Sequence, residues 1–184
     1  ALATLDLDPD QASRATEKSL WRVLQSAAPL GPVRPPGDGA PSVWNRGRCC
    51  GPLLGGCLSL VCALLGTSFQ PNFEGAILFL EDVGEDPYRL DRMFNHLRLA
   101  GVLQQISGLA LGRFRGCFAA KQPPDSFSLR EIVCAHLAAH PVPILADLPY
   151  GHYKKRVVLP LGVNATLDAD SAILQITESA CEER

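Results

Sequence analysis

The sequence predicts an α/β domain, with layered β/α units, a mostly parallel sheet and an antiparallel extension. Short apolar runs such as Ala76–Leu80 and Val142–Leu145 alternate with longer amphipathic segments. Glycine or proline separates most of these segments and indicates turns between them. Buried strands linked by helices produce this alternation, and short apolar runs near the C-terminus account for the antiparallel extension.

Residues 1–45 differ from the rest of the chain. The pattern over Gln11–Gln25 predicts a helix with Leu20, Val23 and Leu24 on its apolar face. Proline and glycine then crowd residues 29–41, which indicates a loop or linker without a core of its own. We therefore expect a boundary near residue 45 and a folded domain over residues 46–184.

Within the second region, helices and strands follow from the spacing of apolar residues. Gly55 and Gly56 predict a turn that opens a helix, and the helix over residues 87–99 repeats apolar residues every three or four positions. A turn at Asp168–Asp170 predicts a closing pair of strands. The expected elements are helices at Leu58–Leu65, Pro87–Leu99 and Leu129–His140, and strands at Ala76–Leu80, Ile106–Phe114, Val142–Leu145, Val157–Leu161 and Ala172–Thr177.

Composition excludes several classes of protein. The 184-residue chain has a net charge of −2, whereas a nucleic-acid-binding protein is usually clearly basic. The longest mostly apolar stretch, Leu53–Leu65, is shorter than the roughly 20 residues needed to span a bilayer. Seven cysteines without a CxxC pair favour reduced, mostly buried thiols in a reducing compartment, here the cytoplasm, and argue against a structural zinc site. We expect no metal, nucleic-acid or membrane partner.

A carboxylate and an imidazole each follow a predicted buried strand. Glu81 comes directly after Ala76–Leu80, and His152 follows Val142–Leu145 through Pro149 and Gly151. Open α/β domains place reactive groups at such strand ends. A histidine paired with an acid forms two thirds of a nucleophile–base–acid triad. Two plainer interpretations stay open: an acid that caps the next helix, and a surface histidine.

Three segments together resemble the C-terminal domain of the serine LD-carboxypeptidases, the family that includes microcin-immunity peptidases. The first runs from Gly55-Gly56-Cys57-Leu58-Ser59-Leu60 to Gly66-Thr67. The second covers residues 75–92, with Leu-Phe-Leu-Glu-Asp-Val-Gly-Glu and Pro-Tyr-Arg-Leu-Asp-Arg-Met. The third is Gly151-His152 followed by Leu159-Pro160-Leu161-Gly162. Residues 17–33 also resemble the segment that joins the two domains of that family.

The resemblance implies a fold and a reaction. The fold is the swivelling-type C-terminal domain, and the reaction releases a terminal D-amino acid, typically D-alanine, from murein tetrapeptide during bacterial cell-wall recycling. These enzymes use no metal or organic cofactor. Their triad is serine, glutamate and histidine, and Glu81 and His152 match its last two members. Gly55, Gly56 and Cys57 match a segment near the substrate cleft.

The chain departs from the family in two respects. Cys57 stands where asparagine is more usual, which affects any polar substrate contact at that position. No serine lies in the Gly-Tyr-Ser-Asp-like motif of the family's N-terminal nucleophile domain. We therefore expect this chain to need that domain as a partner and to be inactive alone. Two alternatives are a non-catalytic domain that binds peptide or sugar, and a domain whose apolar helices form a homodimer.

Overall fold

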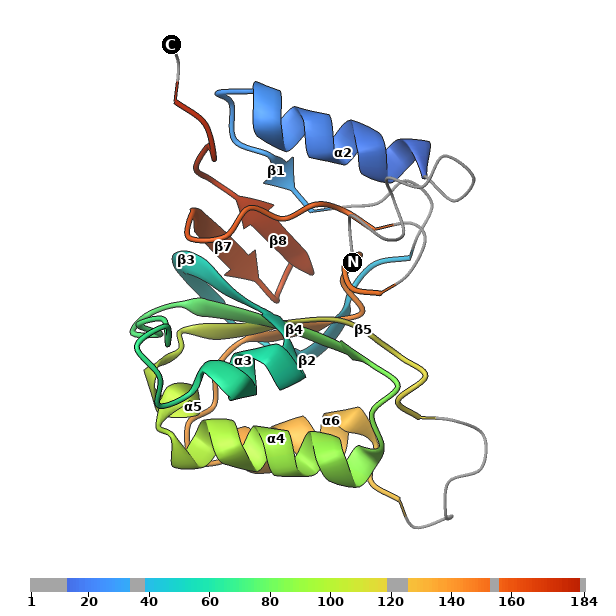
Figure 1. Ribbon diagram of the computed structural model, residues 1–184, viewed down its shortest axis with the longest axis vertical. Helices are drawn as coiled ribbons and strands as arrows, with labels where there is room; N and C mark the ends of the chain where they lie inside the picture. Colours follow the sequence, from blue (N-terminus) through green and yellow to red (C-terminus); the bar gives the residue numbers. More distant parts are fainter. Residues whose placement is uncertain (1–12, 34–38, 119–125, 153–155, 183–184) are drawn as a thin grey trace.

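A curled eight-stranded sheet organises the molecule, and helices lie on both sides of it (Figure 1). The computed structural model describes residues 13–33, 39–118, 126–152 and 156–182. The strand order is β1-β8-β7-β3-β4-β5-β6-β2. The helices are α2 (Arg14–Gln25), α3 (Leu58–Leu64), α4 (Pro87–Leu99), α5 (Val102–Gln105) and α6 (Leu129–Leu137). The strands are β1 (Gly31–Pro32), β2 (Ser42–Asn45), β3 (Arg48–Cys57), β4 (Ile77–Val83), β5 (Gly108–Arg115), β6 (Ile144–Ala146), β7 (Asn164–Asp168) and β8 (Ile173–Ile176).

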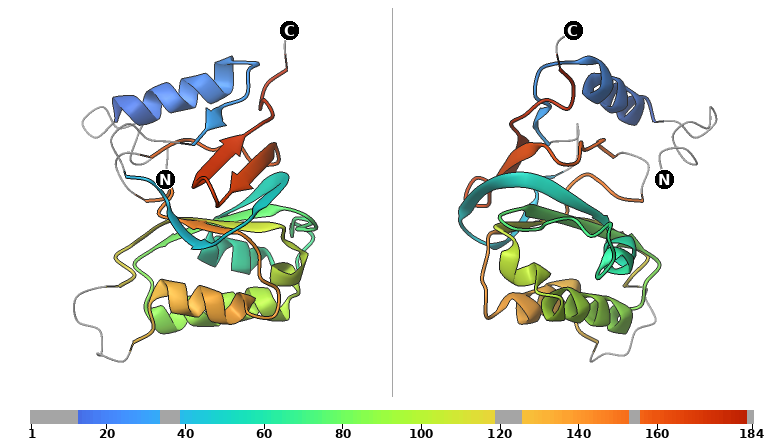
Figure 2. Two further views of the ribbon diagram at one scale, coloured as in Figure 1. Left: turned by 180° about the vertical axis from the view of Figure 1, so that it is seen from behind. Right: turned by 60° about the vertical axis from the view of Figure 1, so that its left-hand side comes forward.

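Strand β3 joins a parallel part of the sheet to an antiparallel part. Its first half, residues 48–52, pairs antiparallel with β7, and its second half, residues 53–57, pairs parallel with β4. Strands β4, β5 and β6 continue the parallel part, while β1, β7 and β8 form the antiparallel extension. The predicted α/β class is therefore confirmed. Figure 2 shows that β3 curves between the two parts, so that β7 and β8 fold back over the parallel strands.

Two apolar cores follow from this curl. Helices α3 to α6 cover one face of the parallel strands, where Leu78, Leu80 and Phe94 are buried (Figure 1). The opposite face packs against β7 and β8 and buries Ile77 and Phe79. Consecutive residues of β4 thus point into different cores, as strand geometry requires. A strand buried on both faces explains why its sequence is a continuous apolar run.

Helix boundaries agree well with the sequence pattern where a terminal signal is present. Helix α4 begins at Pro87 and ends at Leu99, as predicted. Helix α6 begins after Ser128, whose side chain forms a capping box with Glu131, and it ends at Leu137, three residues before the predicted end. The predicted start of the first helix, at Gln11, lies outside the described residues.

The Gly55–Gly56 turn was a wrong prediction, because both residues lie inside β3. Both have positive φ angles, 141° and 147°, that other residues rarely adopt. At Gly55 an added Cβ would lie 1.9 Å from the carbonyl oxygen of Phe79. The glycine therefore permits close approach of β3 to β4 instead of making a turn.

The predicted strand Val157–Leu161 was also wrong, because β8 pairs with β7 at residues 164–168. The backbone N–H groups of residues 157 and 158 are already used elsewhere: that of Val157 donates to the carbonyl of Pro149, and that of Val158 donates to the hydroxyl of Ser19. Pro160 has no N–H to donate. Positions 157, 158 and 160 therefore have no N–H group available for a regular strand pairing.

The proline- and glycine-rich segment contributes more than a loop. Its residues Gly31–Pro32 pair with β8, and Leu30 and Val33 are buried in the second core. Residues 42–45 pair antiparallel with β6 as an edge strand that the sequence pattern did not predict. The division of the chain near residue 45 stays a prediction.

Among the helices of the described ranges, none has the length and apolar character to cross a membrane.

Replacing Gly55 with alanine is expected to destabilise the fold by about 3 kcal/mol or more, because the new Cβ overlaps the Phe79 carbonyl in addition to straining φ. The matched control is Gly56→Ala, which has the same strained φ but no atom within 4 Å of its Cβ. Urea-induced unfolding measures both free energies. Equal losses for the two variants would show that the close approach at Gly55 is not a constraint.

Candidate active site

Glu81 lies near the C-terminal end of β4 with its carboxylate largely removed from water. Its side chain is 9% exposed. Alternation along β4 places it on the same face as Ile77 and Phe79, toward the second core. An isolated buried carboxylate is costly, so its partners must compensate for lost hydration.

His152 supplies two of those partners. Its ring Nδ1 lies 2.8 Å from Oε2 of Glu81, and its backbone N–H donates to the same oxygen at 3.2 Å. The two residues are 71 positions apart in sequence. Their turns meet because β4, β5 and β6 are parallel, so their C-terminal ends share one edge of the sheet. The structure thus brings together the acid and the histidine that the sequence placed at strand ends.

The contact determines which ring nitrogen carries the proton. An ionised carboxylate accepts hydrogen bonds and donates none, so Nδ1 of His152 must carry its hydrogen. In the neutral imidazole, Nε2 then has a free lone pair and can accept a proton. Within the described ranges, no residue hydrogen-bonds to Nε2, and the side chain is 30% exposed. The arrangement suits an imidazole base that acts on a group outside its own loop.

Glycine at position 151 is required by the geometry of this contact. Its φ of 116° is unfavourable for other residues, and an added Cβ would lie 2.8 Å from Oε2 of Glu81. The backbone at Gly151 also forms a parallel bridge with Arg113 at the end of β5. The turn is therefore pressed against both neighbouring strands, which places His152 directly beside Glu81.

Tyr150 fixes the same turn from inside the core. It is 4% exposed, its ring meets Phe79 edge-on at 5.2 Å, and its hydroxyl donates to the carbonyl of Ala110. Gly112 provides room, because a Cβ there would lie 2.5 Å from the Tyr150 ring. Burial, together with the charge of Glu81, raises the pKa of Tyr150 well above its ordinary value. The phenol is therefore a neutral structural donor.

Gly55, Gly56 and Cys57 end β3 beside this site. In the register of the two strands, Cys57 lies opposite Glu81 and Gly56 lies opposite Leu80. The three predicted cleft residues thus lie on the strand next to Glu81. Their role at the substrate cleft stays a prediction.

Asp82 has a role that sequence reasoning missed. It is 2% exposed, and its carboxylate accepts hydrogen bonds from the backbone N–H groups of Ser59 and Val83. Its Oδ1 also lies 3.4 Å from the sulfur of Cys57. Asp82 therefore stabilises the start of α3, a helix that precedes it in the chain. The pairing of β3 with β4 brings it there, and no local signal reveals that pairing.

Cys57 is a poor candidate for a replacement nucleophile. Burial raises the pKa of its thiol, and the charge of Asp82 adds to this shift. The pKa of Cys62, further along α3, rises to about 11 for the same reasons. Since the thiolate is the reactive form, both groups are protonated and unreactive near neutral pH. All seven cysteines are free thiols.

The remaining histidines do not gather into a metal site. Nε2 of His136, on α6, lies 2.8 Å from Oδ1 of Asp91 on α4. Across the described parts of the chain, no three His, Cys, Asp or Glu residues lie close enough together to hold a metal ion.

Comparison with known proteins identifies the family. A model described as the LD-carboxypeptidase C-terminal domain matches residues 50–167, a range that contains Glu81, His152 and strands β4, β5 and β6. The chain belongs to this family. Relatives of this chain are named as carboxypeptidases.

Relatives support the assignment over most of the chain. A relative from Synechocystis sp. with a carboxypeptidase name is 38% identical over 173 residues, which cover 94% of this chain and 54% of that protein. The murein tetrapeptide carboxypeptidase of Pseudomonas aeruginosa is 33% identical over 127 residues, covering 68% and 40% respectively. The chain thus spans about half the length of the curated relatives it matches.

A solved structure shows the same fold. The muramoyltetrapeptide carboxypeptidase from Oxalobacter formigenes superposes with a TM-score of 0.80 at 26% identity, covering 96% of this chain and 59% of that protein. The microcin C7 self-immunity protein MccF superposes with a TM-score of 0.75 at 23% identity. The C-terminal LD-carboxypeptidase fold is therefore confirmed.

Thiol labelling tests the electrostatics around Asp82 in this LD-carboxypeptidase domain. With iodoacetamide at pH 8, exposed Cys50 is expected to react fully before Cys57 and Cys62 react measurably, because raised pKa values keep those thiols protonated. Peptide mass spectrometry follows each site. Substituting Asp82→Asn removes the charge and should accelerate labelling of Cys57; labelling of Cys57 as fast as Cys50 in the unmodified chain would contradict this account.

Replacing Gly151 with alanine is expected to break the Glu81–His152 contact, because the new Cβ occupies space beside Oε2 of Glu81. Nitrogen-15 NMR of the imidazole should show loss of the population that carries its hydrogen on Nδ1. The control is Gly162→Ala, whose φ is also positive at 79° but whose Cβ meets nothing within 4 Å. Each variant is expected to lose about 1–3 kcal/mol of stability from backbone strain. An unchanged imidazole spectrum in Gly151→Ala would refute the steric argument.

Proposed function

We propose that this chain is the C-terminal part of a serine-type LD-carboxypeptidase and supplies two members of a Ser-Glu-His triad. The observation that carries the proposal is the 2.8 Å contact between Nδ1 of His152 and Oε2 of Glu81. In a member of a carboxypeptidase family, such a pair at the C-terminal edge of a parallel sheet suits acyl transfer by a nucleophile and base.

The roles of the two side chains follow from their protonation. Nε2 of His152 accepts the proton of a serine hydroxyl as that oxygen attacks the peptide carbonyl. The imidazolium that forms then donates this proton to the leaving amine. Glu81 holds the ring in the tautomer with hydrogen on Nδ1 and stabilises its positive charge. Because Glu81 is largely shielded from water, its interaction with the imidazolium is stronger than it would be in solvent.

The serine is proposed to come from polypeptide that precedes this region in the complete enzyme. No Gly-x-Ser-x-Gly or Gly-Tyr-Ser-Asp motif is present in the sequence. Residues 1–45 are proposed to connect the two domains, and residues 46–184 to form the C-terminal domain. Gly55, Gly56 and Cys57 are proposed to border the substrate cleft, since they lie on the strand next to Glu81.

The proposed substrate is murein tetrapeptide, from which a terminal D-amino acid such as D-alanine is released in cytoplasmic cell-wall recycling. Two similar proteins, from Pseudomonas aeruginosa and Oxalobacter formigenes, are named as murein tetrapeptide and muramoyltetrapeptide carboxypeptidases. These names support the substrate class for this chain, and no cofactor is required by the triad mechanism.

The decisive experiment joins this chain to the N-terminal domain of the Pseudomonas murein tetrapeptide carboxypeptidase, in place of the matching region. The fusion is expected to release D-alanine from murein tetrapeptide, while the isolated chain releases little. Substituting His152→Ala or Glu81→Gln in the active fusion should reduce kcat by about 10³-fold or more, because triad members depend on one another.

The matched control is His140→Ala, which removes a half-buried histidine just after the C-terminal end of α6 and should leave kcat unchanged. Activity of the fusion that survives His152→Ala would overturn the proposed roles. Tetrapeptide binding by the isolated chain that is indifferent to His152→Ala would favour a binding domain. A dimer in sedimentation without any response to tetrapeptide would favour a dimerisation domain.

A further inference from the structure

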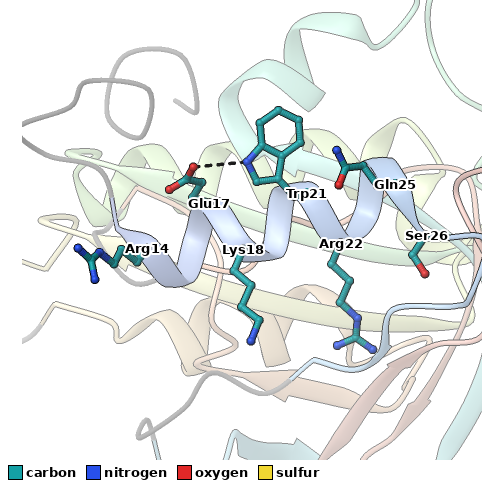
Figure 3. Close-up of a pocket in the computed structure, with 7 residues that line it drawn as sticks. All are labelled: Arg14, Glu17, Lys18, Trp21, Arg22, Gln25 and Ser26. Carbon is teal, nitrogen blue, oxygen red and sulfur yellow. Dashed lines mark hydrogen bonds between the residues drawn. The ribbon is translucent and has the colours of Figure 1, made fainter.

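Helix α2 has two different faces. One face turns inward and carries Thr16, Ser19, Leu20 and Val23, at the spacing of successive helical turns. The other face is exposed and lines a shallow groove of about 640 Å³, along which Glu17, Lys18, Trp21 and Arg22 project from the helix (Figure 3). The predicted apolar face was partly wrong, since Leu24 is 56% exposed and two hydroxyl residues share the inner face.

Those two hydroxyls bind one short segment far along the chain. The hydroxyl of Thr16, a fully buried residue, donates to the backbone carbonyl of Arg156 at 3.0 Å. The hydroxyl of Ser19 accepts from the backbone N–H of Val158, also at 3.0 Å. These contacts join residues 140 and 139 positions apart. Helix α2 thereby satisfies one backbone acceptor and one backbone donor of residues 156–158, which lie outside the strands.

The same segment holds the turn that carries His152. The guanidinium of Arg156, a residue only 6% exposed, donates to the carbonyl of Gly151 at 3.2 Å. The N–H of Val157 donates to the carbonyl of Pro149 at 2.7 Å. Two residues that precede His152 in its turn are therefore tied to a segment that α2 itself anchors. Arg115 adds a separate hydrogen bond to the carbonyl of His152.

We infer that Thr16 and Ser19 are positioning residues that brace the His152 turn through residues 156–158 and so keep the imidazole on Glu81. The inference rests on the proposed function only in giving the imidazole a catalytic role. Its mechanical content is that a helix in the region before residue 45 determines how firmly His152 is held. Neither hydroxyl touches the imidazole, so both act on it through the backbone of residues 156–158.

The test uses the 184-residue chain and compares Thr16→Val/Ser19→Ala with Lys18→Ala/Gln25→Ala. The first pair removes both hydroxyls at little change in volume, and the control pair alters the exposed face of the same helix. Hydrogen exchange followed by NMR reads the His152 amide, which donates to Glu81, and the amides of β4 and β5 as reporters of global opening. Nitrogen-15 spectra read the tautomer of the His152 ring.

In the double hydroxyl variant, the His152 amide is expected to exchange about tenfold faster, and the Nδ1–H population to fall, while the β4 and β5 amides keep their protection. Thr16→Ser with Ser19 intact should restore the original values. Unchanged exchange and tautomer at His152 would overturn the inference. So would equal acceleration of all amides, since that reports general destabilisation.

If the double variant unfolds, Ser19→Ala alone carries the same test, because it leaves the Thr16 contact in place. No readout depends on hydrolysis. An inactive fusion enzyme combined with selective loosening at His152 would therefore refute the proposed function and leave the brace intact. If the fusion is active but the exchange rate and tautomer of His152 do not change when both hydroxyls are removed, the proposed function stands and the brace is refuted.

Discussion

The rest of the site depends on the hydrogen bonds that the buried carboxylate of Glu81 accepts from His152. A charge at the end of a strand that is apolar on both faces needs hydrogen bonds to replace water, and His152 provides two of them. The need of the carboxylate for donors and the need of the imidazole for a fixed tautomer are met by the same contact. The surrounding structure can be understood as the means of bringing two turns, 71 residues apart, within this distance.

Parallel strand order accomplishes most of that task. Strands β4, β5 and β6 end at one edge, so the residues that follow them are neighbours irrespective of their separation in sequence. Close packing then removes the remaining freedom. The lack of a side chain at Gly112 leaves room for the Tyr150 ring, and the lack of one at Gly151 leaves room for the carboxylate of Glu81. These two glycines therefore allow the turn to lie close to β4 and β5.

The curl of β3 adds a second layer above the parallel strands. By pairing with β7 through its first half and with β4 through its second, β3 creates a core on the face toward which Glu81 points. Helix α2 lies beyond this layer (Figure 1) and contacts residues 156 and 158 through its hydroxyls. Helix α2, which precedes residue 45, is therefore connected by hydrogen bonds to the segment that follows the turn of His152.

Local signals in the sequence determined several features by themselves. The apolar run before Glu81 marked a doubly buried strand, and Pro87 with regularly spaced apolar residues marked α4. The carboxylate and the imidazole stood out because each follows such a run. By contrast, Gly55 and Gly56 resembled a turn, yet they serve a close contact between strands, and the Asp82 carboxylate caps a helix earlier in the chain. These roles involve a partner more than 20 residues away, and no local pattern encodes that partner's position.

The sequence by itself thus indicated candidate residues such as Glu81 and His152, because an ionisable residue that follows an apolar run is recognisable from spacing alone. Tertiary structure alone decided which of them meet. It placed Nδ1 of His152 on Glu81, and it joined Thr16 and Ser19 to residues 156 and 158. The physical reason is that a hydrogen bond depends on position within about half an ångström, and this position is set by the register and curl of the whole sheet.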